Sequence, residues 1–396
     1  MLPFVRMLEY GNIKPVPEPI EFYEVLQQQY YNTLYLHTPT NTLYGYGLNS
    51  NKQLGISESP VNDFTVLSTD CKKFWAGVFG TIMISTSNNI YYSGSRGAFP
   101  QSTQNSNTNT WVDVTSYFND VGIVADDIKS VHIGASTRVL LNDGRVACCG
   151  NNAYAECGTG VLGPINTLQV ISQFGSDVQY MACSAWGTHY INADKKSYFV
   201  GENSNGTSGT GNANNSNIGA HTLTNTNVSH ISANFTTTWW FMENGDVYWC
   251  GMNNTGQAGN DSFASGYTLL PQKNSVISET IDIQSLMSPS SLTVQDIGAP
   301  IAKYPSYVRN CGINEYGQLG LGTTTQFERS WNAMNINVLG TYNNILVVSK
   351  DARSSSILTN DYKLYCCGGL NSNGQRLPDG SYVTMTLKLM ANMPWY

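Results

Sequence analysis

The sequence predicts an all-β protein: a seven-bladed β-propeller formed by residues 30–396, preceded by a short extended amino-terminal arm, residues 1–29. Three observations predict this fold. The composition favours strands and tight turns, a Gly-x-Asn element recurs along the chain, and apolar segments with a turn between them precede that element.

The composition favours strands over helices. Of the 396 residues, 41% are apolar, 24 are Tyr and 37 are Gly, a bias typical of strands joined by tight turns. Only 12% are charged, which is about half the usual fraction. Asn, Ser, Thr, Gly and Tyr supply the remaining polarity, which suits a surface that packs against neighbours.

The charge and hydropathy patterns exclude two classes of partner. The net charge is −7, and the 20 Lys and Arg residues are scattered, so we expect no nucleic-acid partner. No run of about 18 apolar residues occurs, so we expect no membrane insertion. The first ten residues lack the basic and apolar regions of a signal peptide.

A repeat determines the expected number of blades. Strong copies of the Gly-x-Asn element begin at Gly47, Gly150, Gly201, Gly251, Gly312 and Gly369. A degenerate copy lies at Gly94, and residues 152–158 keep little of the sequence that follows the element elsewhere. Because the copies are spaced by about 50 residues, they predict seven units.

The segments before the element read as hairpins. Asn142–Gly144 and Glu243–Gly245 each separate two apolar runs, and Asn and Gly tolerate the positive φ of hairpin turns. A single hairpin is marginally stable, so such units must stack face to face. A closed ring of small sheets completes the stacking and protects the strand edges.

The repeat resembles that of the regulator of chromosome condensation family, which includes alpha-tubulin-suppressor-like propellers. The family signature is Gly-x-Asn-x-x-Gly-Gln-Leu-Gly, and Gly312–Gly320 matches every fixed position. The resemblance covers roughly residues 30 to 390 and implies a seven-bladed propeller. Founding members promote nucleotide exchange on a small GTPase and contact chromatin through a wedge and a basic tail. Neither feature is matched here, so no functional residue is carried over.

No local motif predicts catalysis. The chain has no nucleophile elbow and no phosphate-binding loop, so we expect no catalytic, cofactor-binding or metal-binding residue. His132 and His230 precede similar segments and are expected at equivalent repeat positions with packing roles. We expect Gln53, Gln257 and Gln318 to hydrogen-bond to backbone groups in turns.

The nine cysteines lack the spacing of a zinc site. Most lie in apolar strand sequence, so we expect reduced, buried thiols, as in a reducing cytoplasm. Cys148 and Cys149 are adjacent and should point to opposite faces of a strand, so they should not pair with each other.

The amino-terminal arm is interpreted as a docking element. Pro15, Pro17 and Pro19 favour an extended spacer. The arm carries apolar side chains at Leu2, Phe4, Val5, Leu8, Tyr10 and Ile13. Such an arm can add a strand to a partner's sheet or fill its groove. Alternatively, it folds back over an edge of its own ring.

Two long insertions interrupt the repeat, at residues 98–127 and 261–305. The first contains the aromatic residues Phe99, Trp111, Tyr117 and Phe118. Long loops on a rigid scaffold are often functional, so these side chains are candidate ligand-facing residues. Core residues that cap strands are an equal alternative.

Ring closure is expected to use both chain ends. Residues Thr384–Leu389 alternate in polarity and should pair in one sheet with a strand that precedes Asn41.

The function that the sequence favours is a non-enzymatic structural or interaction propeller in a tailed-bacteriophage virion, as a tail, fibre or decoration protein. Residues Leu2–Val5 and Leu8–Asn12 resemble short leaders of phage virion proteins, and the low charge is similar to that of such proteins. Its partners would be other structural proteins of the assembly and a host-surface receptor or glycan, with assembly in the host cytoplasm. The alternative is a cytoplasmic cellular scaffold or small-GTPase regulator, and a propeller enzyme comes third.

Overall fold

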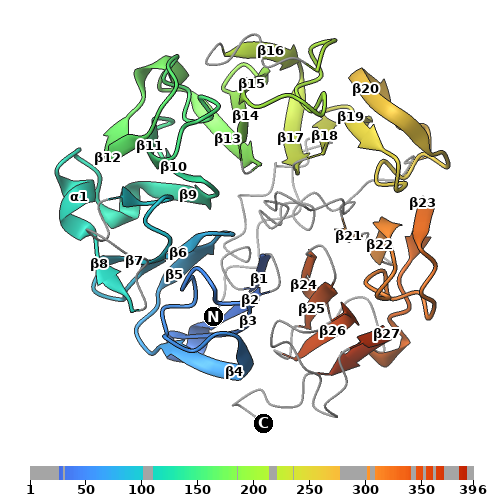
Figure 1. Cartoon of the computed structure of the whole chain (residues 1–396), viewed down its shortest axis with the longest axis horizontal. Helices are drawn as coiled ribbons and strands as arrows, with labels where there is room; N and C mark the ends of the chain where they lie inside the picture. Colours follow the sequence, from blue (N-terminus) through green and yellow to red (C-terminus); the bar gives the residue numbers. More distant parts are fainter. Residues whose placement is uncertain are drawn as a thin grey trace, which may run out of the picture.

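The computed structural model describes residues 26–29, 32–100, 110–184, 186–213, 221–234, 236–276, 301–303, 308–339, 345–350, 354–359, 363–369 and 383–389. Within these residues the chain is a β-propeller of antiparallel sheets that follow one another around a ring in chain order (Figure 1). Helical structure is limited there to α1 (Thr115–Asn119) and to short 3-10 turns at Thr38–Thr40, Ala125–Asp127, Ser172–Phe174 and Asn337–Leu339. The all-β prediction is confirmed.

Each sheet follows a simple up-and-down order of strands. The first contains β1 (Leu26–Gln29), β2 (Asn32–His37), β3 (Thr42–Gly47) and β4 (Val61–Ser68). The second contains β5 (Lys73–Ala76), β6 (Gly80–Ile84), β7 (Ile90–Gly94) and β8 (Val112–Asp113). The third contains β9 (Ile128–Ile133), β10 (Ser136–Leu141), β11 (Val146–Gly150) and β12 (Ile165–Val170). The fourth contains β13 (Val178–Cys183), β14 (Gly187–Asn192), β15 (Ser197–Gly201) and β16 (Thr222–Asn225).

The second half of the ring repeats this order. The fifth sheet contains β17 (Val228–Ala233), β18 (Thr237–Met242), β19 (Val247–Asn253) and β20 (Ala264–Lys273). The sixth contains β21 (Ile301–Lys303), β22 (Val308–Ile313) and β23 (Phe327–Ala333). The seventh contains β24 (Ile345–Lys350), β25 (Ser354–Thr359), β26 (Leu364–Gly369) and β27 (Val383–Leu389).

The prediction of seven blades is corrected. Within the described residues, six sheets have four strands and form complete blades, and the sheet β21–β22–β23 has three strands. Ile301 pairs with Asn310 as Trp239 pairs with Trp249 in the fifth sheet, so β21 corresponds to a second strand. Residues 277–300, which precede β21, lie outside the described part of the chain.

The hairpins form where the sequence predicts them. Leu140 pairs with Val146 across the turn at Gly144, and Phe241 pairs with Val247 across the turn at Gly245. Both glycines have the positive φ that such turns require, at 85° and 86°. The core then forms between neighbouring sheets: Trp239 and Trp249 of the fifth sheet are clustered with Cys311 and Trp331 of the sixth.

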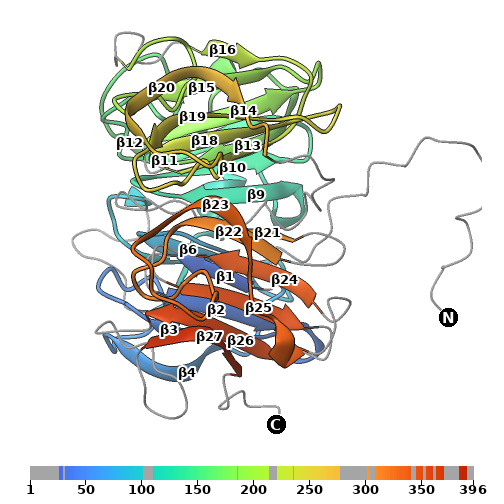
Figure 2. The ribbon, with the colours of Figure 1, turned by 90° about the vertical axis from the view of Figure 1, so that its right-hand side faces the viewer.

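The predicted closure is wrong for the described strands. β27 pairs with β26 of the seventh sheet, and the first sheet is completed by β1 to β4 (Figures 1 and 2). Each terminal sheet therefore has its own four strands, and the two sheets meet by packing. β1 lies against β24, and the Tyr46 hydroxyl is 3.7 Å from the Sγ of Cys366.

Candidate functional site

The loops that follow the Gly-x-Asn elements share one hydrogen-bond pattern. In five described copies the Asn side-chain oxygen accepts from the amide five residues later, at 2.8 to 3.0 Å. The Asn side-chain nitrogen donates to the carbonyl nine residues later, at 2.7 to 3.0 Å. These residues are Asn49, Asn152, Asn203, Asn253 and Asn314, and all five are buried. Each Asn thus holds its own loop at two points.

The Gln of the repeat adds a third point. As expected, Gln53, Gln257 and Gln318 accept through Oε1 from the amide two residues earlier, at 2.9 to 3.0 Å. Glu156 makes the same bond to the Tyr154 amide, at 3.1 Å. The third loop, residues 152–158, is therefore a full copy in which Glu replaces Gln, although its sequence keeps little of the pattern.

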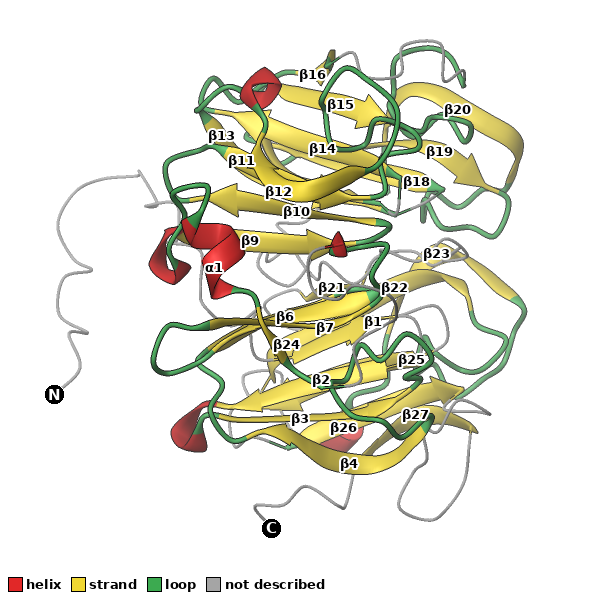
Figure 3. Cartoon of the chain, turned by 60° about the vertical axis from the view of Figure 1, so that its left-hand side comes forward, coloured by secondary structure: helices red, strands yellow, loops and turns green. Residues whose placement is uncertain are grey.

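These loops also join neighbouring sheets. Backbone amides of Gly211, Asp261 and Gly322 donate to carbonyls of the next sheet's outer strand: Leu269, Arg329 and Met385. The distances are 2.9, 3.1 and 2.9 Å. Loops of the fourth, fifth and sixth sheets are therefore clamped at both ends. Figure 3 shows such loops connecting the strands at the edges of the sheets.

Loss of the buried Asn has a defined expected cost. Asn314→Ala leaves the buried Leu319 amide without its acceptor at 3.0 Å and removes the bond to the Thr323 carbonyl. We expect the free energy of unfolding to fall by about 1–3 kcal/mol, measured by urea denaturation. Glu315→Ala, at the exposed neighbouring residue, is the matched control and should change it by less than about 0.5 kcal/mol. Equal effects of the two substitutions would contradict this role for Asn314.

Four cysteines occupy one repeated position between sheets. Each directly precedes a glycine with positive φ, and its Sγ lies 3.2 to 3.9 Å from a carbonyl oxygen of the preceding sheet's loop. They are Cys149, Cys250, Cys311 and Cys367. In the seventh sheet the glycine is Gly368, with φ 112°, and not Gly369 as the sequence alignment placed it. Burial raises the pKa of Cys149 and Cys250, so these thiols stay protonated.

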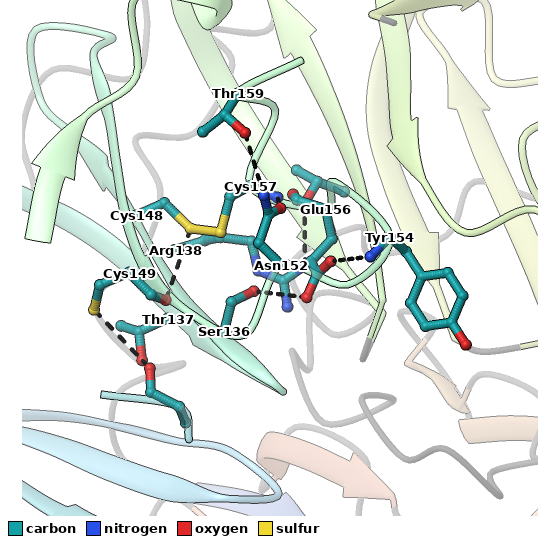
Figure 4. The surroundings of a disulfide bond; sticks show 12 residues. Ser136, Thr137, Arg138, Cys148, Cys149, Asn152, Tyr154, Glu156, Cys157 and Thr159 are labelled. Atoms are coloured by element: carbon teal, nitrogen blue, oxygen red, sulfur yellow. Dashed lines mark hydrogen bonds between the residues drawn. A yellow bond between two sulfur atoms is a disulfide. The ribbon is translucent and has the colours of Figure 1, made fainter. Parts of the chain in front are cut away.

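A disulfide corrects the expectation that all cysteines are reduced. Cys148 in β11 is bonded to Cys157 in the third loop, with their Cα atoms 5.9 Å apart (Figure 4). The loop returns to β11 because the Cys157 amide binds the side chain of Asn152, at 3.0 Å. Cys148 and Cys149 do not pair with each other, as predicted, since the Sγ of Cys149 is directed at the second sheet's Ala98.

Thiol titration tests this assignment. The seven free cysteines are all buried, so the native protein should show few reactive thiols. Denaturation should expose seven thiols, and chemical reduction should raise the count to nine. Nine thiols after denaturation without a reductant would show that the Cys148–Cys157 bond does not form in solution.

A buried charged group connects the third and fourth sheets beside this disulfide (Figure 4). Arg138 in β10 donates to the carbonyls of Gly187 and Ser184 and to the Thr188 hydroxyl, each at 3.0 Å. Thr188 in turn donates to the Glu156 carbonyl at 2.7 Å. Burial raises the pKa of the Glu156 carboxyl, and the charge of Arg138 opposes that rise. Arg138, Thr188 and Glu156 are completely buried at the junction of the third and fourth sheets, so their interactions stabilise the contact between these two sheets.

The two histidines named from the sequence are not equivalent. His132 pairs with Arg138, the third residue of β10, whereas His230 pairs with Phe241, the fifth residue of β18. The segment from His230 to the start of β18 at Thr237 is longer than the segment from His132 to the start of β10 at Ser136, so the two pairings differ in register. Burial lowers the pKa of His132 to about 3 and of His230 to about 4, and the nearby cations Arg138 and Lys195 add to the effect. Both rings are therefore neutral at pH 7 and pack in the sheets.

The aromatic residues that were candidates for facing a ligand instead pack in the core or against it, as the alternative interpretation expected. Phe99 and Phe118 are completely buried and stack with centroids 6.1 Å apart. Tyr117 packs against the same core, and the half-buried Trp111 donates from Nε1 to the Leu67 carbonyl at 2.9 Å. The arm residues Leu2, Phe4, Val5, Leu8, Tyr10 and Ile13 lie outside the described residues.

The sequence reasoning did not single out the exposed apolar side chains. Six of the eleven exposed large apolar residues of the described chain lie in the third, fourth and fifth sheets. They are Val161, Leu162, Leu223, Phe263, Tyr267 and Leu270. The signal in the sequence was available: residues 157–176, 203–242 and 262–272 contain no Asp, Glu, Lys or Arg. We call these six residues the neutral arc.

The described residues contain neither a metal-binding cluster nor a membrane-spanning helix. No three His, Cys, Asp or Glu side chains gather there to hold a metal ion. Within the same residues, no helix has the length and apolar character needed to cross a membrane.

The fold is shared with solved propellers, whereas no family model matches the sequence. Yeast RCC1 (Prp20), in its complex with Kap60, superposes with a TM-score of 0.70 at 12% identity, covering 98% of this chain and 90% of that one. A second structure, of Prp20p from Saccharomyces cerevisiae, gives 0.69 at 12% identity and covers 94% and 89% of the two chains. Human WBSCR16 gives 0.69 at 16% identity, covering 89% and 95%. The chain is therefore similar in fold to RCC1-type β-propellers.

Proposed function

We propose that this chain is a non-enzymatic interaction propeller: a rigid ring that contacts other proteins through its loops and outer strands. The observation that carries this proposal is the repeated loop junction: a buried Asn holds each of five loops, and a backbone bond ties the loops of the fourth, fifth and sixth sheets to the next sheet. Preformed loops lose little conformational entropy on binding, which favours their use as contact surfaces. The similar yeast propeller is described with Kap60, Gsp1p and histones, and this supports proteins as the class of partner.

Within this class the chain is a structural component of a tailed-bacteriophage particle, as a tail, fibre or decoration protein assembled in the host cytoplasm. Three features support this assignment: the 12% charged residues, the compositional bias toward Asn, Ser, Thr and Tyr, and the apolar residues of the arm. The arm, residues 1–29, docks on other structural proteins of the particle, and the ring is displayed toward a host-surface receptor or glycan.

Removal of residues 1–19 tests this assignment. The truncated chain is expected to keep the circular dichroism spectrum and melting temperature of the full chain but to be absent from purified particles, as measured by mass spectrometry. The full chain, expressed in the same way, is the control and should be incorporated. Absence of the full chain from particles, or normal incorporation of the truncated one, would contradict the assignment.

The second candidate is a cellular scaffold or a small-GTPase regulator. The fold similarity to Prp20p, which is described together with Gsp1p, favours this candidate. Accelerated release of a fluorescent guanine nucleotide from a purified small GTPase would support it over the virion component.

A further inference from the structure

The Cys148–Cys157 disulfide lies at a contact that recurs between a strand and the loop that follows it. The contact joins the residue two places before the positive-φ glycine to the residue five places after the buried Asn. In the first sheet Leu54 packs over the glycine at this position, and in the sixth Asn310 donates from its side-chain nitrogen to the Leu319 carbonyl at 3.2 Å. In the third sheet the same two positions are covalently bonded (Figure 4). A bond that a reductant can open therefore takes the place of a non-covalent contact.

Cys157 lies between two residues that join the third loop to the fourth sheet. The Glu156 carbonyl accepts from the Thr188 hydroxyl at 2.7 Å. The Gly158 carbonyl lies 2.9 Å from Nε2 of His221, which directly precedes β16. Among the described residues this loop makes no backbone bond to the outer strand of the next sheet, unlike the loops of the fourth, fifth and sixth sheets. The disulfide therefore anchors a loop that the described backbone does not clamp to its neighbour.

The exposed end of this loop, residues 158–163, is the part that the anchor holds in place, and we call it the loop tip. Its Val161 and Leu162 side chains are 66% and 58% exposed. The Val161 carbonyl accepts from the Asn152 side chain at 2.8 Å, and the same side chain accepts from the Cys157 amide at 3.0 Å. The position of the apolar tip is thus set by the base of the loop, and the base is bonded to β11 through the disulfide.

We propose that the Cys148–Cys157 bond is a redox-controlled lock on the loop tip. The closed bond fixes the tip against β11 and the fourth sheet, and reduction frees it, so the presentation of Val161 and Leu162 depends on the oxidation state of the chain. The neighbouring thiol of Cys149 is directed at the second sheet, so it does not compete for either sulfur of the bond. The lock operates whether or not the chain belongs to a virion.

The lock opens by thiol–disulfide exchange with a dithiol compound. A thiolate of the dithiol attacks one sulfur, the S–S bond breaks, and a mixed disulfide forms while the displaced thiolate takes up a proton. The second thiol of the reductant then closes its own disulfide and releases the other cysteine as a thiol. The dithiol loses two electrons and two protons, and the protein gains them. Both sulfurs are buried, so the attack occurs when the loop opens, and an oxidised disulfide compound reverses the reaction.

Hydrogen exchange of the full chain, followed by mass spectrometry with and without dithiothreitol, tests the lock. Reduction is expected to make the amides of residues 157–163 exchange at least about tenfold faster, because loss of a disulfide typically costs more free energy than a factor of ten requires. The amides of Ala258 and Leu319, at the same place in the fifth and sixth sheets' loops, should keep their rates.

Two variants identify the bond that responds. Cys148→Ser with Cys157→Ser should exchange like the reduced chain whether or not dithiothreitol is present. The matched control, Cys149→Ala, changes the neighbouring free cysteine and should respond as the unmodified chain does. A bond that excess dithiothreitol does not open in the folded chain would overturn the proposal. Opening of the bond without faster exchange at the tip, or with equal acceleration in the fifth and sixth sheets' loops, would also overturn it.

Discussion

Replacing Arg138 with methionine is expected to lower the free energy of unfolding by about 3–5 kcal/mol. The substitution leaves two backbone carbonyls and the Thr188 hydroxyl of the fourth sheet without their donors at 3.0 Å. It also removes the positive charge that acts on the buried carboxyl of Glu156. Urea denaturation at pH 7 measures the change.

Glu156→Gln is the matched control for this experiment. This substitution introduces the Gln that occupies the same position in three other loops, at Gln53, Gln257 and Gln318. We therefore expect the free energy of unfolding to change by less than about 1 kcal/mol. Combined with Arg138→Met, it should recover part of the lost stability, because no carboxyl is then left without a counter-charge. An Arg138→Met protein as stable as the unmodified chain would show that this junction does not hold the third and fourth sheets together.

Acidification from pH 7 to pH 4.5 is expected to reduce the free energy of unfolding by several kcal/mol. Burial lowers the pKa of His132 and His189 to about 3 in the folded protein, whereas the ordinary value is 6.5. The unfolded chain therefore binds protons below pH 6.5 that the folded chain excludes until about pH 3. Their stabilising contribution is full above pH 6.5 and falls by about 1.4 kcal/mol per pH unit for each histidine. The raised pKa of Glu156 acts in the opposite sense and offsets part of the loss.

Urea midpoints at pH 7.5, 5.5 and 4.5 measure this dependence. His132→Leu removes one titrating group, so the loss of stability per pH unit should be smaller by about 1.4 kcal/mol than in the unmodified chain. His37→Leu is the control: His37 is half-buried and burial lowers its pKa too, so its removal should change the dependence in the same sense but less than His132→Leu does. Stability that is constant between pH 7.5 and 4.5 would contradict the assignment of buried neutral histidines.

The repeat made most of the fold predictable because its residues act locally. Gly144 and Gly245 have the positive φ that their turns require, and Gln53, Gln257 and Gln318 bind the backbone as expected. Local sequence patterns do not determine which sheet the first and last strands of the ring join. Each terminal sheet draws four strands from contiguous sequence, so the predicted exchange of a strand between them does not occur.

The candidate site was less predictable because it depends on contacts between distant segments. Cys148 pairs with Cys157 because the third loop, residues 152–158, folds back onto β11. The repeat is hard to recognise in the sequence of this loop, since Glu156 replaces Gln. The aromatic side chains of Phe99 and Phe118 gave no sign in the sequence of which side they face, and they are buried. The exposed apolar residues of the neutral arc leave only a weak trace, the absence of charge around them.

The central claim is that each Gly-x-Asn loop is a fixed part of the ring, and native-state hydrogen exchange tests it most directly. The amides that donate to the five Asn side chains belong to Leu54, Cys157, Ser208, Ala258 and Leu319. Their hydrogens are expected to exchange only in openings that cost nearly as much free energy as exchange in the central strands. Exchange of these five amides at the rates of unprotected loops would contradict the claim.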